Sequence, residues 1–169
     1  MNKLDDNFFM KKALQLAEEA LVNGEFPVGA LIVYENEIIA TGSRRGSSGE
    51  TPDETDHAEM ICLKNCVNSG RSIDRLKTTL FCTLEPCLMC FGAIIISGTG
   101  RIVYAYEDVM GGGTGCDLEK LAPLYKESPI SIVPGILREE SLKLFKAFFL
   151  NPNNNYWKKS LLSVYTLQQ

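Results

Sequence analysis

The chain has 169 residues, of which 45% are hydrophobic and 22% charged, and its formal net charge is −4. This length fits one compact domain, and the apolar content excludes a mostly disordered polymer. The acidic balance also argues against a globally basic surface for nucleic acids, although it leaves room for a local basic patch.

Targeting signals are the next feature to examine. No apolar run approaches the length of about 18 residues that spans a bilayer, and residues 1–6 lack the charged-then-apolar order of a secretory signal. We therefore expect a cytoplasmic protein that does not associate with membranes. In that compartment the six cysteines stay reduced, so they serve as packing residues, metal ligands or nucleophiles.

The first third of the chain predicts a helix and a hairpin. Apolar residues recur at helical spacing over residues 5–23, and Gly24 follows as a stop. A nearly continuous apolar run over 28–34 is typical of a strand covered on both faces. A turn leads into a second strand over 38–41, and residues 42–56 then form a polar surface loop.

Helices and strands alternate after this loop. Periodicity and the positions of proline and glycine predict helices over 57–68, 86–97, 138–149 and 157–166, and strands over 79–84, 101–106 and 130–133. A glycine-rich run at 111–115 leads into a further short helix. The alternation indicates a layered α/β domain with a mixed sheet. We expect one domain over 1–150, with 151–169 as its helical C-terminal extension.

Two short motifs carry the chemistry. His57 stands two residues before Glu59 at one helix start, and Pro86 precedes Cys87 and Cys90 at another. Two cysteines three residues apart share a helix face, and the helix dipole at its first turn favours thiolate. Two thiolates and one imidazole supply three protein ligands, the number that a catalytic zinc uses when a fourth position stays open to water. We expect one zinc ion per chain.

Glu59 has a separate predicted role. Residues two apart on a helix diverge by about 200°, so Glu59 can stand over the water position rather than bind the metal beside His57. A carboxylate there accepts and returns protons, and this pair of motifs is the signature of zinc deaminases. The alternative interpretation is a first-turn carboxylate that only complements the helix dipole.

On these residues the chain resembles the cytidine deaminase superfamily, in particular its bacterial tRNA adenosine deaminases. The likeness runs from about Met10 to Phe149 and includes the stretches Gly24–Ala30, His57–Glu59, Thr83–Cys90, Gly92–Ile94 and Gly135–Leu137. It implies a three-layer α/β/α cytidine deaminase-like fold with a central mixed sheet of about five strands. It also implies a homodimer in which the apolar helix after Cys87 contacts the partner.

The resemblance further implies where the substrate lies. Backbone groups around Ala58 and around Leu84, Glu85 and Pro86 would orient the base. Phe26 and Ser43 are additional candidates for substrate contacts.

Other interpretations of the same residues stay open. Cys87 and Cys90 could form a redox pair, or a closed structural zinc could recruit a fourth cysteine from Cys62, Cys66, Cys82 and Cys116. Cys62, Cys66 and Cys82 lie among apolar residues, which favours core packing. The glycine run lacks the lysine of a phosphate-binding loop, so we interpret it as a turn near the site.

The substrate is less determined than the reaction. The loop before His57 is acidic, with Glu50, Asp53, Glu54 and Asp56 only partly offset by Arg44 and Arg45, and so it would repel a phosphodiester backbone. The aromatic C-terminal extension could cover the pocket, or it could pack on the body or on a partner subunit. We therefore favour a free nucleobase or nucleoside, with wobble adenosine in tRNA as the alternative. A zinc-stabilised interaction module is a non-enzymatic alternative that leaves Glu59 unexplained.

Overall fold

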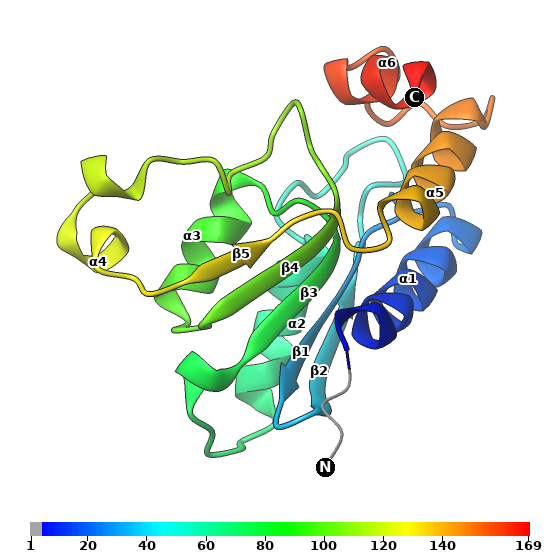
Figure 1. Cartoon of the computed structure of the whole chain (residues 1–169). Helices are drawn as coiled ribbons and strands as arrows, with labels where there is room; N and C mark the ends of the chain where they lie inside the picture. Colours follow the sequence, from blue (N-terminus) through cyan, green and yellow to red (C-terminus); the bar gives the residue numbers. More distant parts are fainter. Residues whose placement is uncertain (1–4) are drawn as a thin grey trace.

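The computed structural model describes residues 5–169, which form a five-stranded sheet flanked by helices (Figure 1). The strand order is β2-β1-β3-β4-β5. β1 runs antiparallel to both of its neighbours, whereas β3, β4 and β5 are parallel to one another. The strands are β1 (Gly29–Tyr34), β2 (Glu37–Ser43), β3 (Thr79–Leu84), β4 (Arg101–Tyr106) and β5 (Ser131–Val133). The predicted α/β fold with a mixed sheet of about five strands is confirmed.

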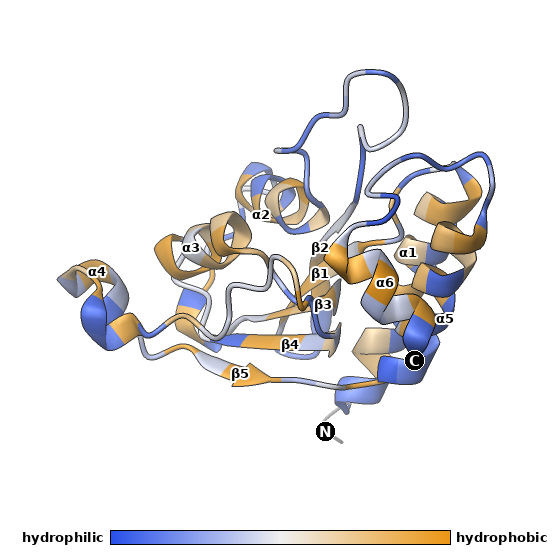
Figure 2. Cartoon of the chain, turned by 90° about the horizontal axis from the view of Figure 1, so that it is seen from above, coloured by the Kyte–Doolittle hydropathy of each residue, from blue (hydrophilic) through white to orange (hydrophobic). Residues whose placement is uncertain are grey.

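Helices cover the two faces of the sheet in separate groups: α2 and α3 lie together on one side of the strands, whereas α1 packs with α5 (Figure 2). None of the described helices is both long and apolar enough to cross a membrane. The α-helices are α1 (Asp6–Val22), α2 (Ala58–Asn68), α3 (Leu88–Ile96), α4 (Pro123–Lys126), α5 (Arg138–Leu150) and α6 (Leu161–Gln168), and the 3₁₀ turns are η1 (Arg75–Lys77) and η2 (Leu118–Lys120).

The sheet separates two hydrophobic cores, as the alternation of side chains along β1 shows. Ala30 and Ile32 pack into the core formed with α2 and α3. Leu31 and Val33 point to the opposite face, into the core formed with α1. Successive strand residues face opposite sides, so a strand buried on both faces needs an unbroken apolar run. This is why residues 28–34 read as continuously hydrophobic.

Local signals set the boundaries of the hairpin and of α2. Glu35 and Asn36 both adopt positive φ, the conformation of a two-residue hairpin turn whose twist matches the strands. Gly42 of β2 lies so close to α2 that an added Cβ would stand 2.2 Å from the carbonyl oxygen of Ala58. This approach fixes the start of α2, and with it His57, against the sheet.

The helix that follows β3 begins later than its sequence predicts. Cys87 has an extended backbone and is the N-cap of α3, so the helix starts at Leu88 rather than at Pro86. Only Cys90 of the two zinc-ligand candidates therefore lies within the first turn. The favourable effect of the helix dipole still reaches Cys87 at the cap.

The terminal helix also starts later, at Leu161 rather than at residue 157. Ser160 is its N-cap, and the Ser160 side chain accepts a hydrogen bond from the backbone N–H of Ser163. Trp157 and Lys159 adopt left-handed backbone conformations, with φ of 50° and 66°. Non-glycine residues avoid this region inside a helix, so the chain turns at Trp157 before the helix forms.

Candidate active site

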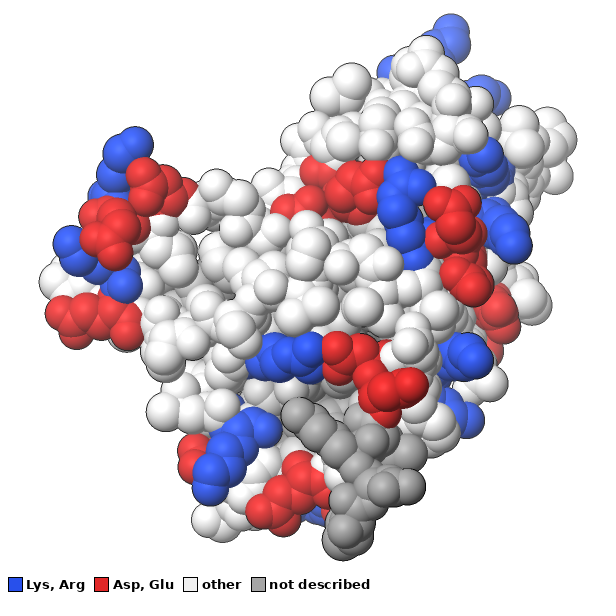
Figure 3. Space-filling view, in the orientation of Figure 1, with Lys and Arg blue, Asp and Glu red and all other residues white. Residues whose placement is uncertain are grey.

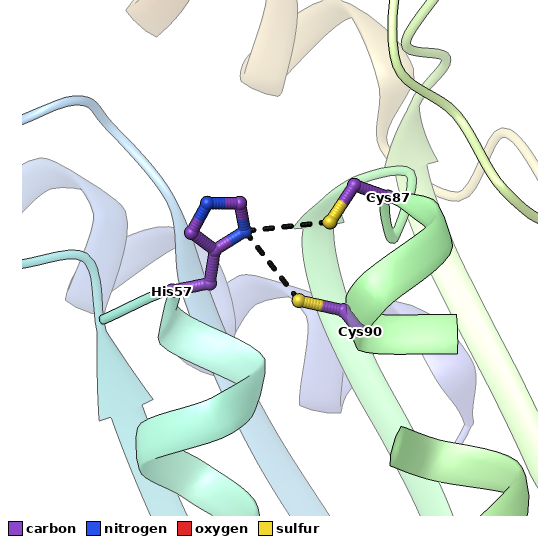
Figure 4. Close-up of side chains that lie close together, drawn as sticks. All are labelled: His57, Cys87 and Cys90. Carbon is purple, nitrogen blue, oxygen red and sulfur yellow. Dashed lines mark hydrogen bonds between the residues drawn. The ribbon is translucent and has the colours of Figure 1, made fainter. Parts of the chain in front are cut away.

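Three potential metal ligands meet at one edge of the sheet. His57 is the N-cap of α2, and Cys87 and Cys90 lie at the start of α3. The Nδ1 atom of His57 stands 3.5 Å from Sγ of Cys87 and 3.4 Å from Sγ of Cys90 (Figure 4). Among the described residues these three form the one group of histidine, cysteine and acidic side chains close enough to share an ion.

The spacing of these atoms fits zinc. With Zn–S near 2.3 Å and Zn–N near 2.05 Å, a tetrahedral site separates sulfur from nitrogen by about 3.5 Å. The Nδ1–Sγ distances of 3.5 and 3.4 Å match this edge. The ligand atoms of His57, Cys87 and Cys90 all lie within 4.8 Å of one another, so the fold brings together the three residues that the sequence predicts as zinc ligands.

The protonation of the two thiols differs because they interact. The neighbouring Cys90 thiol and the His57 ring lower the pKa of Cys87 to about 4, against the opposing effect of burial. The hydrogen bond between Cys90 and Cys87, together with burial, raises the pKa of Cys90. The hydrogen bond with Cys87 also raises the pKa of His57. One thiolate is thus ready as a ligand, and a cation between the sulfurs would favour the second.

Glu59 lies beside this group without belonging to it. Glu59 is 3% exposed, and it lines a pocket that His57 and Cys87 also line. Burial raises the pKa of Glu59 to about 7, which places it in the range suited to a group that both accepts and donates a proton. A carboxylate with only a helix-dipole role would face solvent, so its burial favours the catalytic interpretation.

Glu59 lines a small pocket with a cavity volume of about 50 Å³. The predicted substrate-contact residues Phe26, Ala58, Leu84 and Glu85 line it, together with His57 and Cys87. Two other predicted contacts, Ser43 and Pro86, are not among the lining residues. Ser43 pairs with Gly29 in the sheet, and the Pro86 carbonyl accepts a hydrogen bond from the backbone N–H of Gly113.

Four of the lining residues were not among the predicted site residues: Val28, Arg44, Asp108 and Gly111. Tyr156 and Trp157 also line the pocket, which agrees with the expectation that the aromatic C-terminal extension could cover it. Asp108 follows β4 and is 6% exposed, and its Oδ1 accepts hydrogen bonds from the backbone N–H groups of Met110 and Gly111. Burial raises the pKa of Asp108. Since the carboxyl ends of the parallel strands β3 and β4 meet at one edge, the acidic residue after β4 was the signal that could have indicated it.

The glycine-rich loop packs against the start of α3. Gly112 forms a β-bridge with Cys87, and an added Cβ at Gly113 would stand 2.7 Å from backbone atoms of Leu88. The Glu85 side chain accepts hydrogen bonds from the backbone and hydroxyl of Thr114 in the same loop. The glycines thus let the loop lie directly on the backbone of Cys87 and Leu88, which agrees with a turn near the site.

The remaining cysteines stay outside the cluster. Cys62, Cys66 and Cys82 are buried in the core, and Cys116 is half-buried. Within residues 5–169 no fourth cysteine joins His57, Cys87 and Cys90. The cluster therefore offers three protein ligands, as an open catalytic zinc requires, rather than the four of a closed structural site.

Comparisons with known proteins agree with this geometry. Residues 3–106 match the family model of the cytidine and deoxycytidylate deaminase zinc-binding region. The chain is 36% identical over 148 residues to a tRNA-specific adenosine deaminase of Buchnera aphidicola, covering 86% of this chain and 95% of that protein. It is 34% identical over 155 residues to tRNA-specific adenosine deaminase 2 of Xenopus tropicalis, covering 87% and 90%.

Solved structures show the same fold. One structure, from studies of A-to-I editing by tRNA:A34 deaminases, superposes with a TM-score of 0.64 at 29% identity and covers 81% of this chain and 98% of that one. A second, a variant of the protein NE0047 in complex with 8-azaguanine, has a TM-score of 0.67 at 25% identity and covers 84% and 82%.

Proposed function

This chain belongs to the cytidine and deoxycytidylate deaminase family, and from that premise we propose how its site works and which substrate it takes. The reaction replaces an exocyclic amine on a nucleobase by a carbonyl and releases ammonia. The observation that carries the proposal is the position of Glu59, which is buried in the pocket beside His57, Cys87 and Cys90 but does not belong to that group of potential metal ligands.

Each part of the site contributes a separate step. Zinc held by His57, Cys87 and Cys90 would supply Lewis acidity, which brings the pKa of a water molecule towards neutral. The Glu59 carboxylate takes one proton from the attacking water and passes it to the ring nitrogen next to the reacting carbon. It then takes the second proton from the hydroxyl now bonded to that carbon and passes it to the amine, which leaves as ammonia while the carbonyl forms. The walls around Ala58 and Leu84 orient the ring and exclude bulk water.

The relatives favour adenosine in tRNA as the substrate. Both curated relatives described above carry the name of tRNA-specific adenosine deaminases and are 36% and 34% identical to this chain. This likeness supports conversion of wobble adenosine to inosine better than it supports the free nucleobase or nucleoside that the sequence led us to favour. Adenosine in an anticodon loop is therefore the first substrate to test.

A specific observation keeps the small substrate as a second candidate. Tyr156 and Trp157, from the C-terminal extension, line the pocket itself. Furthermore, the face in Figure 3 intersperses Lys and Arg with Asp and Glu rather than presenting one continuous basic surface. A phosphodiester backbone gains most of its affinity from such a surface.

Ammonia release tests both candidates in one assay. Adenine, guanine, cytosine, their nucleosides and a tRNA anticodon stem-loop are each incubated with the zinc-loaded protein. We expect Glu59→Gln to reduce turnover by a factor of about 10² to 10⁴, the usual contribution of general acid–base catalysis, while zinc content stays unchanged. Glu18→Gln, an exposed position on α1, is the matched control. Near-normal turnover in Glu59→Gln would refute the mechanism.

We also propose that two copies associate through α2 and α3. Several large apolar side chains are exposed on these helices: Val67 (62%), Leu88 (63%), Met89 (38%) and Ile96 (60%). An apolar groove runs between them and includes Leu63 and Ala93. Such a face is suited to a self-complementary dimer contact.

A further inference from the structure

The C-terminal extension is fastened beside the pocket by a cluster of polar groups. The Tyr156 hydroxyl donates a hydrogen bond of 2.8 Å to Oε2 of Glu54 and accepts one of 3.4 Å from Nη2 of Arg44. Arg44 and Glu54 form an ion pair at 3.7 Å, and the Arg44 guanidinium stands 5.9 Å from the centre of the Tyr156 ring. These three residues, called the latch below, join segments that are about a hundred positions apart in the sequence.

Arg44 is committed to this arrangement. Arg44 is 3% exposed, and its guanidinium also donates hydrogen bonds to the backbone carbonyls of Arg45 and Asp56. Asp56 directly precedes the zinc ligand His57. The cation nearest to the pocket is therefore used to order the loop and hold Tyr156, rather than being left available for a phosphate group.

Aromatic contacts connect Tyr156 of the latch to the other rings that line the pocket. The Tyr156 and Trp157 rings stack with centroids 5.1 Å apart at 11°, and both contact the buried ring of Phe26. Asn154 shapes the turn that presents them, because its Oδ1 accepts from the backbone N–H of Tyr156. Trp157 holds a left-handed backbone conformation, and such strain persists where surrounding contacts over-determine it, often at functional sites.

A second anchor holds the far end of the extension. The Tyr165 hydroxyl donates to Glu107, which also accepts two hydrogen bonds from Arg138. Tyr106 and Thr166 are joined through their hydroxyl groups. Because α6 is fixed in this way, the segment between α5 and α6 is held at both ends as it passes the pocket.

We propose that Arg44, Glu54 and Tyr156 are specificity-determining residues, which hold Trp157 over the pocket and restrict it to a substrate the size of a single base or nucleoside. The proposal rests on the deaminase function above and takes its second candidate, the small substrate, in place of the tRNA that the relatives favour. A base within a polynucleotide brings its flanking sugars and phosphates to the pocket, where the Tyr156 and Trp157 rings occupy space. The Arg44 guanidinium, which could otherwise meet a phosphate, is paired with Glu54. A polynucleotide substrate would have to release the latch first.

Steady-state kinetics of the zinc-loaded full chain test this proposal. Tyr156→Phe keeps the ring but removes the hydroxyl, Trp157→Ala removes the cover, and Tyr34→Phe at the opposite end of β1 is the control. For the best monomeric substrate we expect Tyr156→Phe to raise KM by about 2- to 10-fold, as loss of one hydrogen bond predicts, with kcat nearly constant. For an anticodon stem-loop we expect kcat/KM to rise in Tyr156→Phe and further in Trp157→Ala.

The outcomes separate this proposal from the function on which it rests. Suppose that the wild type deaminates a base. If Tyr156→Phe and Trp157→Ala then show the wild-type KM and the wild-type ratio of kcat/KM for the monomeric substrate to kcat/KM for the stem-loop, the latch has no role in specificity. If the wild type prefers the stem-loop, the restriction is refuted although the deaminase function stands. If no amine substrate releases ammonia, the proposed function itself fails. Urea unfolding midpoints equal to that of the wild type show that the variants are folded.

Discussion

Phe26 joins the pocket to the hydrophobic core, and its removal can be assigned a magnitude. The side chain is 3% exposed and lies 5.1 to 6.0 Å, centroid to centroid, from the rings of Phe145, Phe148, Phe149, Tyr156 and Trp157. A buried aromatic side chain removes about 150–250 Å² from water, which at about 25 cal/mol per Å² gives about 4–6 kcal/mol. Residual structure in the unfolded chain lowers this figure, so we expect Phe26→Ala to cost about 3–5 kcal/mol of unfolding free energy.

Urea unfolding followed by far-UV circular dichroism measures this cost, and the chain offers a matched control. Phe8 is 41% exposed on α1, so Phe8→Ala loses far less buried area and should cost no more than about 1–2 kcal/mol. If Phe26→Ala costs no more than Phe8→Ala, the inference that these six rings form one packed unit is wrong. A large cost would show that the covering segment and the core stabilise each other.

Three further predictions concern the metal, the acid range and assembly. Elemental analysis should find one zinc per chain in the wild type and in Cys116→Ala. It should find little zinc in Cys87→Ala, because only two of the three proposed ligands remain in that variant. Full zinc occupancy in Cys87→Ala would contradict the proposed site. Burial alone would raise the pKa of Glu25, but hydrogen bonds from Ser47 and Ser48 hold this pKa below 4.5. The ionised Glu25 side chain therefore stabilises the folded state above pH 4.5, and this contribution is lost as the pH falls through the lowered pKa. In Glu25→Gln the unfolding free energy should therefore depend less on pH below 4.5, and an unchanged pH profile would exclude this role. Light scattering of the wild type should give about twice the chain mass of 18.7 kDa, and Ile96→Glu should give the mass of a monomer. A monomeric wild type would refute the proposed contact through α2 and α3.

The strands and the cluster of candidate zinc ligands were predictable because their signals are local. The strands expected at 79–84 and 101–106 coincide with β3 and β4, since an apolar run bounded by polar residues marks both ends of a buried strand. His57, Cys87 and Cys90 were equally accessible, because their residue types and spacing reflect the ligand number and geometry of zinc. The position of Glu59 beside this cluster follows from its fixed offset to His57, and its catalytic role stays a prediction.

The pocket lining and the C-terminal turn were less predictable because they depend on contacts between distant segments. Arg44 and Tyr156 are 112 positions apart, and no periodic pattern in either segment indicates that they meet. The sequence predicts that the last helix begins at Trp157, whereas Ser160 is the N-cap and the helix begins at Leu161. Side chains that converge through topology are recognised only when the strand order is known.

Trp157 gives this molecule a built-in optical reporter. It is the single tryptophan of the chain, and its indole stacks on Tyr156 in the lining of the pocket. Excitation at the red edge of indole absorption would therefore isolate the emission of one ring at one place. A base entering the pocket should change the intensity of that emission, and movement of the extension into solvent should shift it to longer wavelength. Occupancy and opening could thus be followed separately, in real time and without a label.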